Sequence, residues 1–380
     1  MRKNGISGCF SLFGFLALLL SGFTCFAILF SGVSAEAPQP LPEEARSVLP
    51  EPPETGPADT AVPGTGEVSG VSEAEETLRR DLTGYADVPP SDAGTAEADP
   101  LPAPSGNENL PEGAHPVIPS DLSCAQTPDF ILSNGETDAK PDCSLLAERD
   151  FSVPLAKEVF AGESGESPVV LIVHTHGTES YLPDGRTYAL DGDTFNTEDT
   201  SENVVAVGAV LAETLRAHGI PTVHCKTMHN LESYDNAYEK ECETVLSCLA
   251  AYPTIRYVLD IHRDGLINAD GEHIRPVFAA EGGDAAQIMF VVGTNENGAN
   301  HPNWEDNLTV AAKWQKKLLA AYPASARPIN LRKSSFNQQY TPASLLIEVG
   351  GNANTLAEAK RSAVLLGDTL AELIYELSEA

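Results

Sequence analysis

Five consecutive aliphatic residues, Val169 to Val173, are followed directly by the polar sequence HTHGTES. An apolar run of this length is typical of a β-strand that is buried on both faces, as in parallel sheets covered by helices. In such sheets, ligands bind at the edge where the strands end. This run therefore predicts both a fold class and the place of a functional site.

The sequence from about Asp150 onward supports this fold class. Short apolar runs alternate with stretches of helical periodicity, which is typical of βα units. We predict one α/β domain over residues 150–380, with a central, mostly parallel twisted sheet flanked by helices. Strands are expected at 169–174, 220–224, 255–261, 288–292 and 344–349, and helices at 202–217, 234–251, 307–321 and 355–377.

The N-terminal region has the features of a membrane anchor. Residues 9–33 contain no charge and are long enough to cross the hydrocarbon core as a helix. Arg2 and Lys3 precede this run, so the positive-inside rule places residues 1–8 in the cytoplasm and the rest of the chain outside. A cleaved signal peptide is the alternative, because Val33-Ser34-Ala35 resembles a cleavage site. The run is longer than a signal peptide needs, which favours a single-pass anchor.

The segment that follows is rich in proline and acidic residues. Of the 28 prolines in the chain, 16 lie between Glu36 and Leu122, together with 18 acidic and three basic residues. Such a composition cannot bury enough apolar area to offset chain entropy, so residues 34–149 are expected to form a disordered linker. Cys124 and Cys143 lie near its end, and a disulfide between them would fit an oxidising compartment. The formal net charge of −32 argues against nucleic acid as a partner.

Three of the predicted strands carry polar residues at or near their carboxyl ends. His176 and Glu179, in the order H-x-x-E, follow the first strand, His262 follows the third, and Glu348 lies near the end of the last. If these strands are parallel neighbours, the residues meet at one edge of the sheet. Two histidines and a carboxylate, with a fourth position left open, are the ligand set of hydrolytic Zn²⁺ sites. Glu348 is expected to be the catalytic base, with a pKa raised by burial.

Five segments in this order resemble those of a known family: HTHGTESY (174–181), ENVVAVGAVLAETLRAHGI (202–220), DIHRDG (260–265), HPNWEDNL (301–308) and IEVGGNANTLAEA (347–359). From about Pro168 onward, the chain resembles the stage II sporulation protein P family. The resemblance implies a zinc-dependent peptidoglycan hydrolase of the N-acetylmuramoyl-L-alanine amidase type, with endopeptidase activity also credited to the family. It also implies a role in forespore engulfment, with the catalytic domain in the septal intermembrane space and other engulfment proteins as partners.

The identity of the second metal ligand stays open between two glutamates. In the wider amidase superfamily this ligand is a glutamate at the start of the first helix, which here is Glu202. The sporulation family carries the glutamate of H-x-x-E, which favours Glu179. Glu202 also has a simpler role, because a carboxylate in the first turn stabilises a helix. His174 also lies at the end of the first strand, and it is expected to be a packing residue and not a metal ligand.

Five further residues are weaker candidates for the site. Asp264 could orient a ligand imidazole, and Arg263 and Arg275 could bind the carboxylates of a stem peptide. Asn295 and Trp304 could line a substrate groove. Structural ion pairs explain the arginines equally well, and core packing does the same for Trp304.

Two other functions are consistent with these motifs. H-x-x-E followed by a distant histidine and a late glutamate is also the ligand pattern of zinc carboxypeptidases, so a peptidase that acts on stem peptides is one alternative. The other is a membrane-tethered module that binds the wall without catalysis, in which Glu348 would be dispensable.

Overall fold

The computed structural model describes residues 110–123, 131–133, 137–155 and 167–379. The predicted cytoplasmic tail, the anchor at 9–33 and most of the linker lie outside these residues. Among the residues that are described, no helix is both long enough and apolar enough to cross a membrane.

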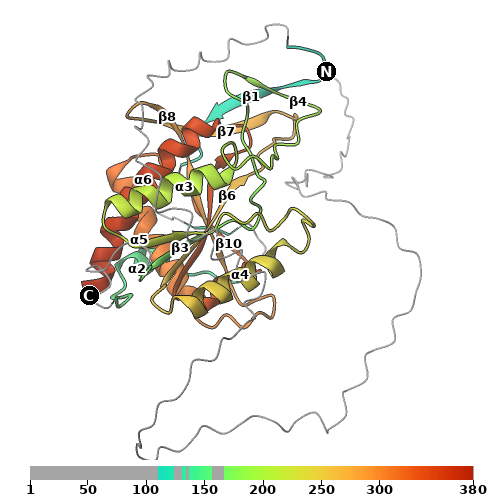
Figure 1. Ribbon diagram of the computed structural model, residues 1–380. Coiled ribbons are helices and arrows are strands. Elements are labelled where there is room, and N and C mark those ends of the chain that lie inside the picture. The colour runs from blue at the N-terminus through green and yellow to red at the C-terminus, as the bar shows by residue number, and fades with distance from the viewer. Residues whose placement is uncertain (1–109, 124–130, 134–136, 156–166, 380) are drawn as a thin grey trace, which may run out of the picture. The chain divides into compact units, whose positions relative to one another are not determined.

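A seven-stranded sheet forms the centre of the fold, in the order β2-β10-β9-β11-β6-β3-β5 (Figure 1). All neighbouring strands are parallel except β9 and β11. The prediction of a mostly parallel sheet is therefore confirmed, with one reversal that the sequence did not indicate. The strands are β2 (Ile131–Ser133), β3 (Val170–Val173), β5 (Thr222–His224), β6 (Tyr257–Asp264), β9 (Ile288–Gly293), β10 (Ile329–Arg332) and β11 (Ala343–Gly351).

Helices cover both faces of this sheet. One face is covered by α3 (Val204–Ala217), α5 (Trp304–Ala321) and α6 (Leu356–Glu379), and the other by α4 (Ala237–Ala251) (Figure 1). Alternate residues of β3 enter the two cores: Val170 and Ile172 pack with α3 and α6, while Leu171 and Val173 pack with α4. Every residue of β3 is buried for this reason, which explains the uninterrupted aliphatic run.

A second sheet has four strands in the order β4-β1-β7-β8. These are β1 (Ala114–Ser120), β4 (Tyr188–Leu190), β7 (His273–Ala280) and β8 (Gly283–Ala286). Strand β1 was not predicted from the sequence, because it contains Pro116 and Pro119. The strand tolerates them because residues 114–116 pair only with β4 and residues 117–120 only with β7, so each half has one free side.

The last part of the predicted disordered linker is folded, so the predicted boundary near residue 150 is wrong. Besides β1 and β2, this part contains α2 (Cys143–Glu148), which packs on α5. The Asp142 side chain caps α2 by accepting hydrogen bonds from the backbone N–H groups of Ser144 and Leu145. The acidic, proline-rich composition of the whole segment concealed these short apolar stretches.

Cys143, one of the two cysteines of the suggested disulfide, stands at the start of α2. Cys143 is free and buried, and burial, followed by the neighbouring Asp142 charge, raises the pKa of its thiol to about 12. Cys124 lies outside the described residues.

Candidate metal centre

Three adjacent parallel strands bring the predicted site residues together. In the order β11-β6-β3, β6 lies in the middle, and Glu348 of β11 is paired in register with His262 of β6. Paired residues on parallel strands project from the same face, which here is the α4 face. His176 and Glu179 follow β3 directly, so both enter the site from its edge.

His176, Glu179 and His262 form a compact buried cluster. Their potential ligand atoms all lie within 4.8 Å of one another. Nδ1 of His176 is 3.6 Å from Oε1 of Glu179, and Nδ1 of His262 is 3.4 Å from Oε2 of the same carboxylate. Two imidazoles that share one carboxylate provide the nitrogen and oxygen donors that Zn²⁺ takes in catalytic sites.

An unpaired imidazole nitrogen in this cluster supports the fit to a metal ion. Nε2 of His176 is buried and has no hydrogen-bond partner among the described residues, and the same holds for Oε2 of Glu348. Buried polar atoms are nearly always paired, because leaving one unpaired costs about 1–3 kcal/mol. The residues therefore fit a bound cation.

Burial and neighbouring charges set which groups of the cluster are charged when no metal is bound. Burial disfavours the ionised form of Glu179, but the charge of His262 and the nearby His176 imidazole outweigh it and hold the pKa below its usual value. Burial likewise opposes the charged form of His262, but Asp260 and Glu179 raise its pKa well above 6.5. Without a metal, Glu179 is thus an anion whose positive partner is protonated His262, and His262 would release its proton on binding a metal.

Glu348 lies beside this cluster and is not one of the three close donors. Its side chain is half-buried, and burial, followed by the charge of Asp264, raises its pKa to about 8. A carboxyl group with a pKa near neutrality can both accept and return a proton, as the predicted acid/base role requires.

The partner of His262 is Asp260, which the sequence reading missed. Oδ2 of Asp260 is 2.8 Å from Nε2 of His262, and its carboxylate accepts hydrogen bonds from N and Oγ1 of Thr175 at 2.9 and 2.7 Å. Asp260 precedes His262 by two residues on β6, so both point to the same face, and the pattern D-x-H was the available signal. Asp264, predicted for this role, instead pairs with Arg327 at 2.9 Å.

Glu202, the alternative ligand, is exposed and does not belong to the cluster. Helix α3 begins two residues later than predicted, at Val204, with Asn203 as its cap. Oδ1 of Asn203 accepts a hydrogen bond from Val205 N at 3.0 Å. The structure therefore places Glu179, and not Glu202, with the two histidines.

The two candidate arginines are engaged within the protein. Arg263 donates from Nε to the carbonyl of Ser180 at 3.0 Å and from Nη2 to that of Phe195 at 2.8 Å, and so holds the loop after Glu179. Arg275 is buried and pairs with Glu358 and Asp284 at 3.2 and 3.3 Å. The geometry therefore supports a structural role for both arginines and not the binding of substrate carboxylates.

Asn295 and Trp304 lie away from the metal cluster, contrary to prediction. Both follow β9, which is antiparallel to β11, so they leave the sheet at the opposite edge. Asn295 is exposed there, and Trp304 begins α5 and packs half-buried against the main core. One turn further along α5, Oδ1 of Asn307 accepts a hydrogen bond from Ser344 N at the start of β11, which confirms this edge.

His174 packs on the other face of the sheet from the metal cluster, because β3 ends at Val173 and the chain turns between His174 and His176. Its Nε2 lies 2.8 Å from Nε2 of His224, beneath α3. Gly208 of α3 makes room for this pair, because a Cβ at that position would come within 2.6 Å of the His174 ring.

Two tyrosines that the sequence reading did not select also contact the cluster. The Tyr234 ring stacks on His176, with centroids 4.0 Å apart and an interplanar angle of 13°, and Tyr238 meets the same imidazole edge-on at 5.5 Å. Both come from the chain that follows β5, a strand parallel to β3, so the available signal was their place at the same sheet edge.

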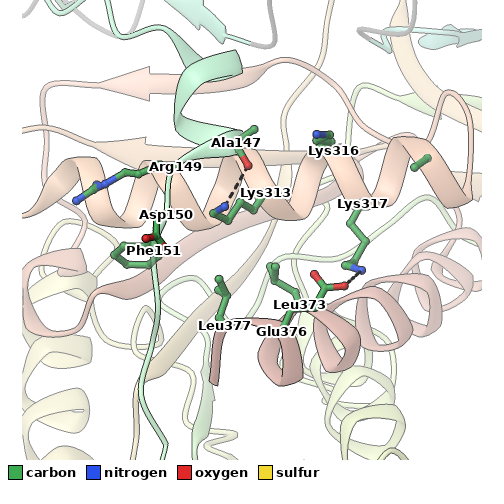
Figure 2. A pocket seen from close by; sticks show the side chains of 11 residues that line it. Ala147, Arg149, Asp150, Phe151, Lys313, Lys316, Lys317, Leu373, Glu376 and Leu377 are labelled. Carbon is green, nitrogen blue, oxygen red and sulfur yellow. Dashed lines mark hydrogen bonds and ion pairs between the residues drawn. The ribbon is translucent and has the colours of Figure 1, made fainter. Parts of the chain in front are cut away.

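A separate pocket of about 440 Å³ lies between α5, α6 and the chain after α2 (Figure 2). Its lysines are already paired: Nζ of Lys313 donates to the Ala147 carbonyl, Lys316 pairs with Glu148, and Lys317 pairs with Glu376. It lies in the helical layer on the opposite face of the sheet from α4, and it provides no comparable group of metal ligands.

Comparison with known proteins places the chain in a family. The model of the family "Stage II sporulation protein P (SpoIIP)" matches residues 126–371. "Stage II sporulation protein P" of Bacillus subtilis (strain 168) is 29% identical over an alignment of 228 residues, and the match covers 56% of this chain and 53% of that protein. The chain thus spans about half the length of that relative.

Solved structures of amidases are similar at a lower level. N-acetylmuramoyl-L-alanine amidase AmiC2 of Nostoc punctiforme is 14% identical, over 57% of this chain and 99% of that one, with a TM-score of 0.34. The CwlD amidase from Clostridioides difficile, in complex with the GerS lipoprotein, is 10% identical over 55% and 99%, with a TM-score of 0.35. These likenesses are too low to carry an argument. The family match, in contrast, covers more than half of the chain, and the protein therefore belongs to the stage II sporulation protein P family.

Proposed function

We propose that this protein is a zinc-dependent peptidoglycan hydrolase, an N-acetylmuramoyl-L-alanine amidase that acts during sporulation. The observation that carries the proposal is the buried cluster of His176, Glu179 and His262, with Glu348 beside it. Family membership and the name of the Bacillus subtilis relative support the role in sporulation.

The residues divide the chemistry between them. His176, Glu179 and His262 would hold the zinc ion. Zinc at such a site supplies Lewis-acid polarisation of the scissile carbonyl and lowers the pKa of water. Glu348 takes a proton from the attacking water and returns it to the leaving amine. Asp260 fixes the orientation of the His262 ring, and Arg263 fixes the loop that carries Glu179.

The proposed setting is the outer surface of the membrane. Residues 9–33 form a single-pass anchor with its N-terminus in the cytoplasm, and the acidic linker lets the catalytic domain reach peptidoglycan in the septal intermembrane space. The uncharged run and the basic residues before it support this orientation. Other engulfment proteins are the expected partners.

The alternatives fit the geometry less well. A carboxypeptidase needs an arginine for the terminal carboxylate of its substrate, and Arg263 and Arg275 are engaged elsewhere. A non-catalytic wall-binding module does not explain why Glu348 lies beside the cluster with its buried Oε2 unpaired. An additional endopeptidase activity is compatible with the site.

Mass spectrometry of the products tests the proposal. Purified murein sacculi are digested with the zinc-loaded full chain, and the soluble products are analysed. Free peptides that begin with L-alanine are the expected result. Shortened peptides that are still attached to muramic acid would replace the amidase with a peptidase.

A further inference from the structure

The loop between β5 and α4 belongs to the same sheet edge as the metal cluster. Strand β5 is parallel to β3 and directly beside it, so residues 225–236 leave the sheet where His176 does. The periodicity predicts a helix from Tyr234, but α4 begins at Ala237, which leaves Tyr234 in the loop. Loops at this edge are where sheets of this kind bind ligands.

Tyr234 is unusually exposed for an aromatic residue next to a buried site. One face of its ring stacks on His176 at 4.0 Å, yet 62% of the residue is accessible to solvent. Leu231, in the same loop, is 50% exposed. The outer face of the Tyr234 ring, at the rim of the cluster, and the Leu231 side chain, in the same loop, are thus both open to solvent.

The need to support the His176 imidazole does not by itself explain why Tyr234 stacks on it. The imidazole already has Glu179 at 3.6 Å, the His262 ring edge-on at 5.1 Å, and the Tyr238 ring edge-on at 5.5 Å. Tyr238 is half-buried and packs on Phe336, so it is the more rigid support. Tyr234 adds a flat surface whose second face has no partner ring among the described residues.

We infer that Tyr234 is a substrate-binding residue, whose outer ring face packs against the substrate group next to the scissile amide. Large aromatic rings gain binding energy when such a face is removed from water. Leu231 extends the contact surface. This inference rests on the proposed function, because it takes the substrate to be a muramoyl peptide.

Binding to a defined probe tests the inference. The probe is N-acetylmuramoyl-L-alanyl-D-isoglutamine, titrated by calorimetry into zinc-loaded full chain that carries Glu348→Gln to prevent hydrolysis. Adding Tyr234→Leu should raise Kd by about tenfold, the loss of one aromatic contact. Tyr234→Phe should keep Kd within about twofold, since it retains the ring, and zinc content should not change in either variant.

The controls separate the possible failures. Tyr375→Leu, which replaces a tyrosine on α6 that is 40% exposed, should leave Kd unchanged. An unchanged Kd in Tyr234→Leu would overturn the inference and leave the proposed function intact. A loss of zinc in proportion to the loss of binding would also overturn it, because Tyr234 would then act by supporting the metal ligand His176. No binding by the Glu348→Gln parent would contradict the proposed function and, with it, the inference.

Discussion

Glu348 and His262 occupy the same register position on the adjacent parallel strands β11 and β6. The proposed acid/base group is thereby fixed beside a proposed metal ligand by backbone pairing alone. The proposed metal ligand and the proposed acid/base residue are thus different side chains, so binding of the metal and transfer of the proton can be tested separately.

Replacing Glu348 with glutamine should abolish hydrolysis without loss of zinc. Glutamine keeps the shape of the side chain but cannot accept the proton, and general base catalysis typically contributes about 10²–10⁴-fold. We expect kcat on soluble muropeptides to fall by about 100-fold or more, with zinc content equal to that of the parent. Activity within a few-fold of the parent would show that Glu348 is not the acid/base residue.

The two candidate carboxylate ligands can be compared directly. Glu179→Gln should strongly reduce zinc content measured by atomic absorption, because Glu179 faces both imidazoles. Glu202→Gln should retain zinc, since Glu202 is exposed and lies outside the cluster. The reverse pattern would show that the loop rearranges around the metal and that Glu202 is the ligand.

Removing the charge of Asp260 should weaken zinc binding through His262. Partners of metal-binding histidines typically contribute about 10–100-fold to affinity, and Asp260→Asn should raise the zinc Kd by an amount in this range. Asp264→Asn is a matched control on the same strand, because Asp264 pairs with Arg327 and not with His262. Equal zinc Kd values for the two variants would argue against the role of Asp260.

A buried carboxyl group on α4 should make stability depend on pH. Glu241 is almost fully buried and accepts a hydrogen bond from Nδ2 of Asn337, and burial, followed by the Asp260 charge, raises its pKa to about 8. A pKa that is higher in the folded state than the usual 4.5 means that the folded protein binds this proton more tightly. Its contribution to stability is therefore full below about pH 4.5 and is lost as the pH rises towards 8.

Glu241→Gln should remove this dependence in metal-free protein. The free energy of unfolding should be measured with urea for both proteins between pH 5 and 8. As the pH rises, the value for the parent should fall relative to that for the variant, by at most about 1.4 kcal/mol per pH unit. Glu243→Gln, an exposed change on the same helix, should show no such trend. Parallel pH profiles for the parent and Glu241→Gln would mean that Glu241 is ionised in the folded state throughout.

The elements with long buried apolar runs could be predicted from sequence. The run at β3 indicated a buried strand because both faces are covered, and three such strands indicated the edge where His176, His262 and Glu348 meet. Short elements such as β1 could not be predicted, because its residues pair on one side at a time and two of them are proline.

Strand direction was the other piece of information that the sequence did not contain. Nothing in the apolar run of β9 distinguishes parallel from antiparallel pairing, so Asn295 and Trp304 were assigned to the wrong edge. Asp260, in contrast, could have been found, because two residues of spacing on a strand place it on the same face as His262.

The most direct test of the metal site is the anomalous scattering of zinc in crystals of the zinc-loaded protein. We predict one strong peak at the zinc absorption edge, bounded by His176, Glu179 and His262, with Glu348 adjacent but not coordinating. The account would be contradicted by a peak that these three residues do not surround, or by no peak in protein that hydrolyses murein.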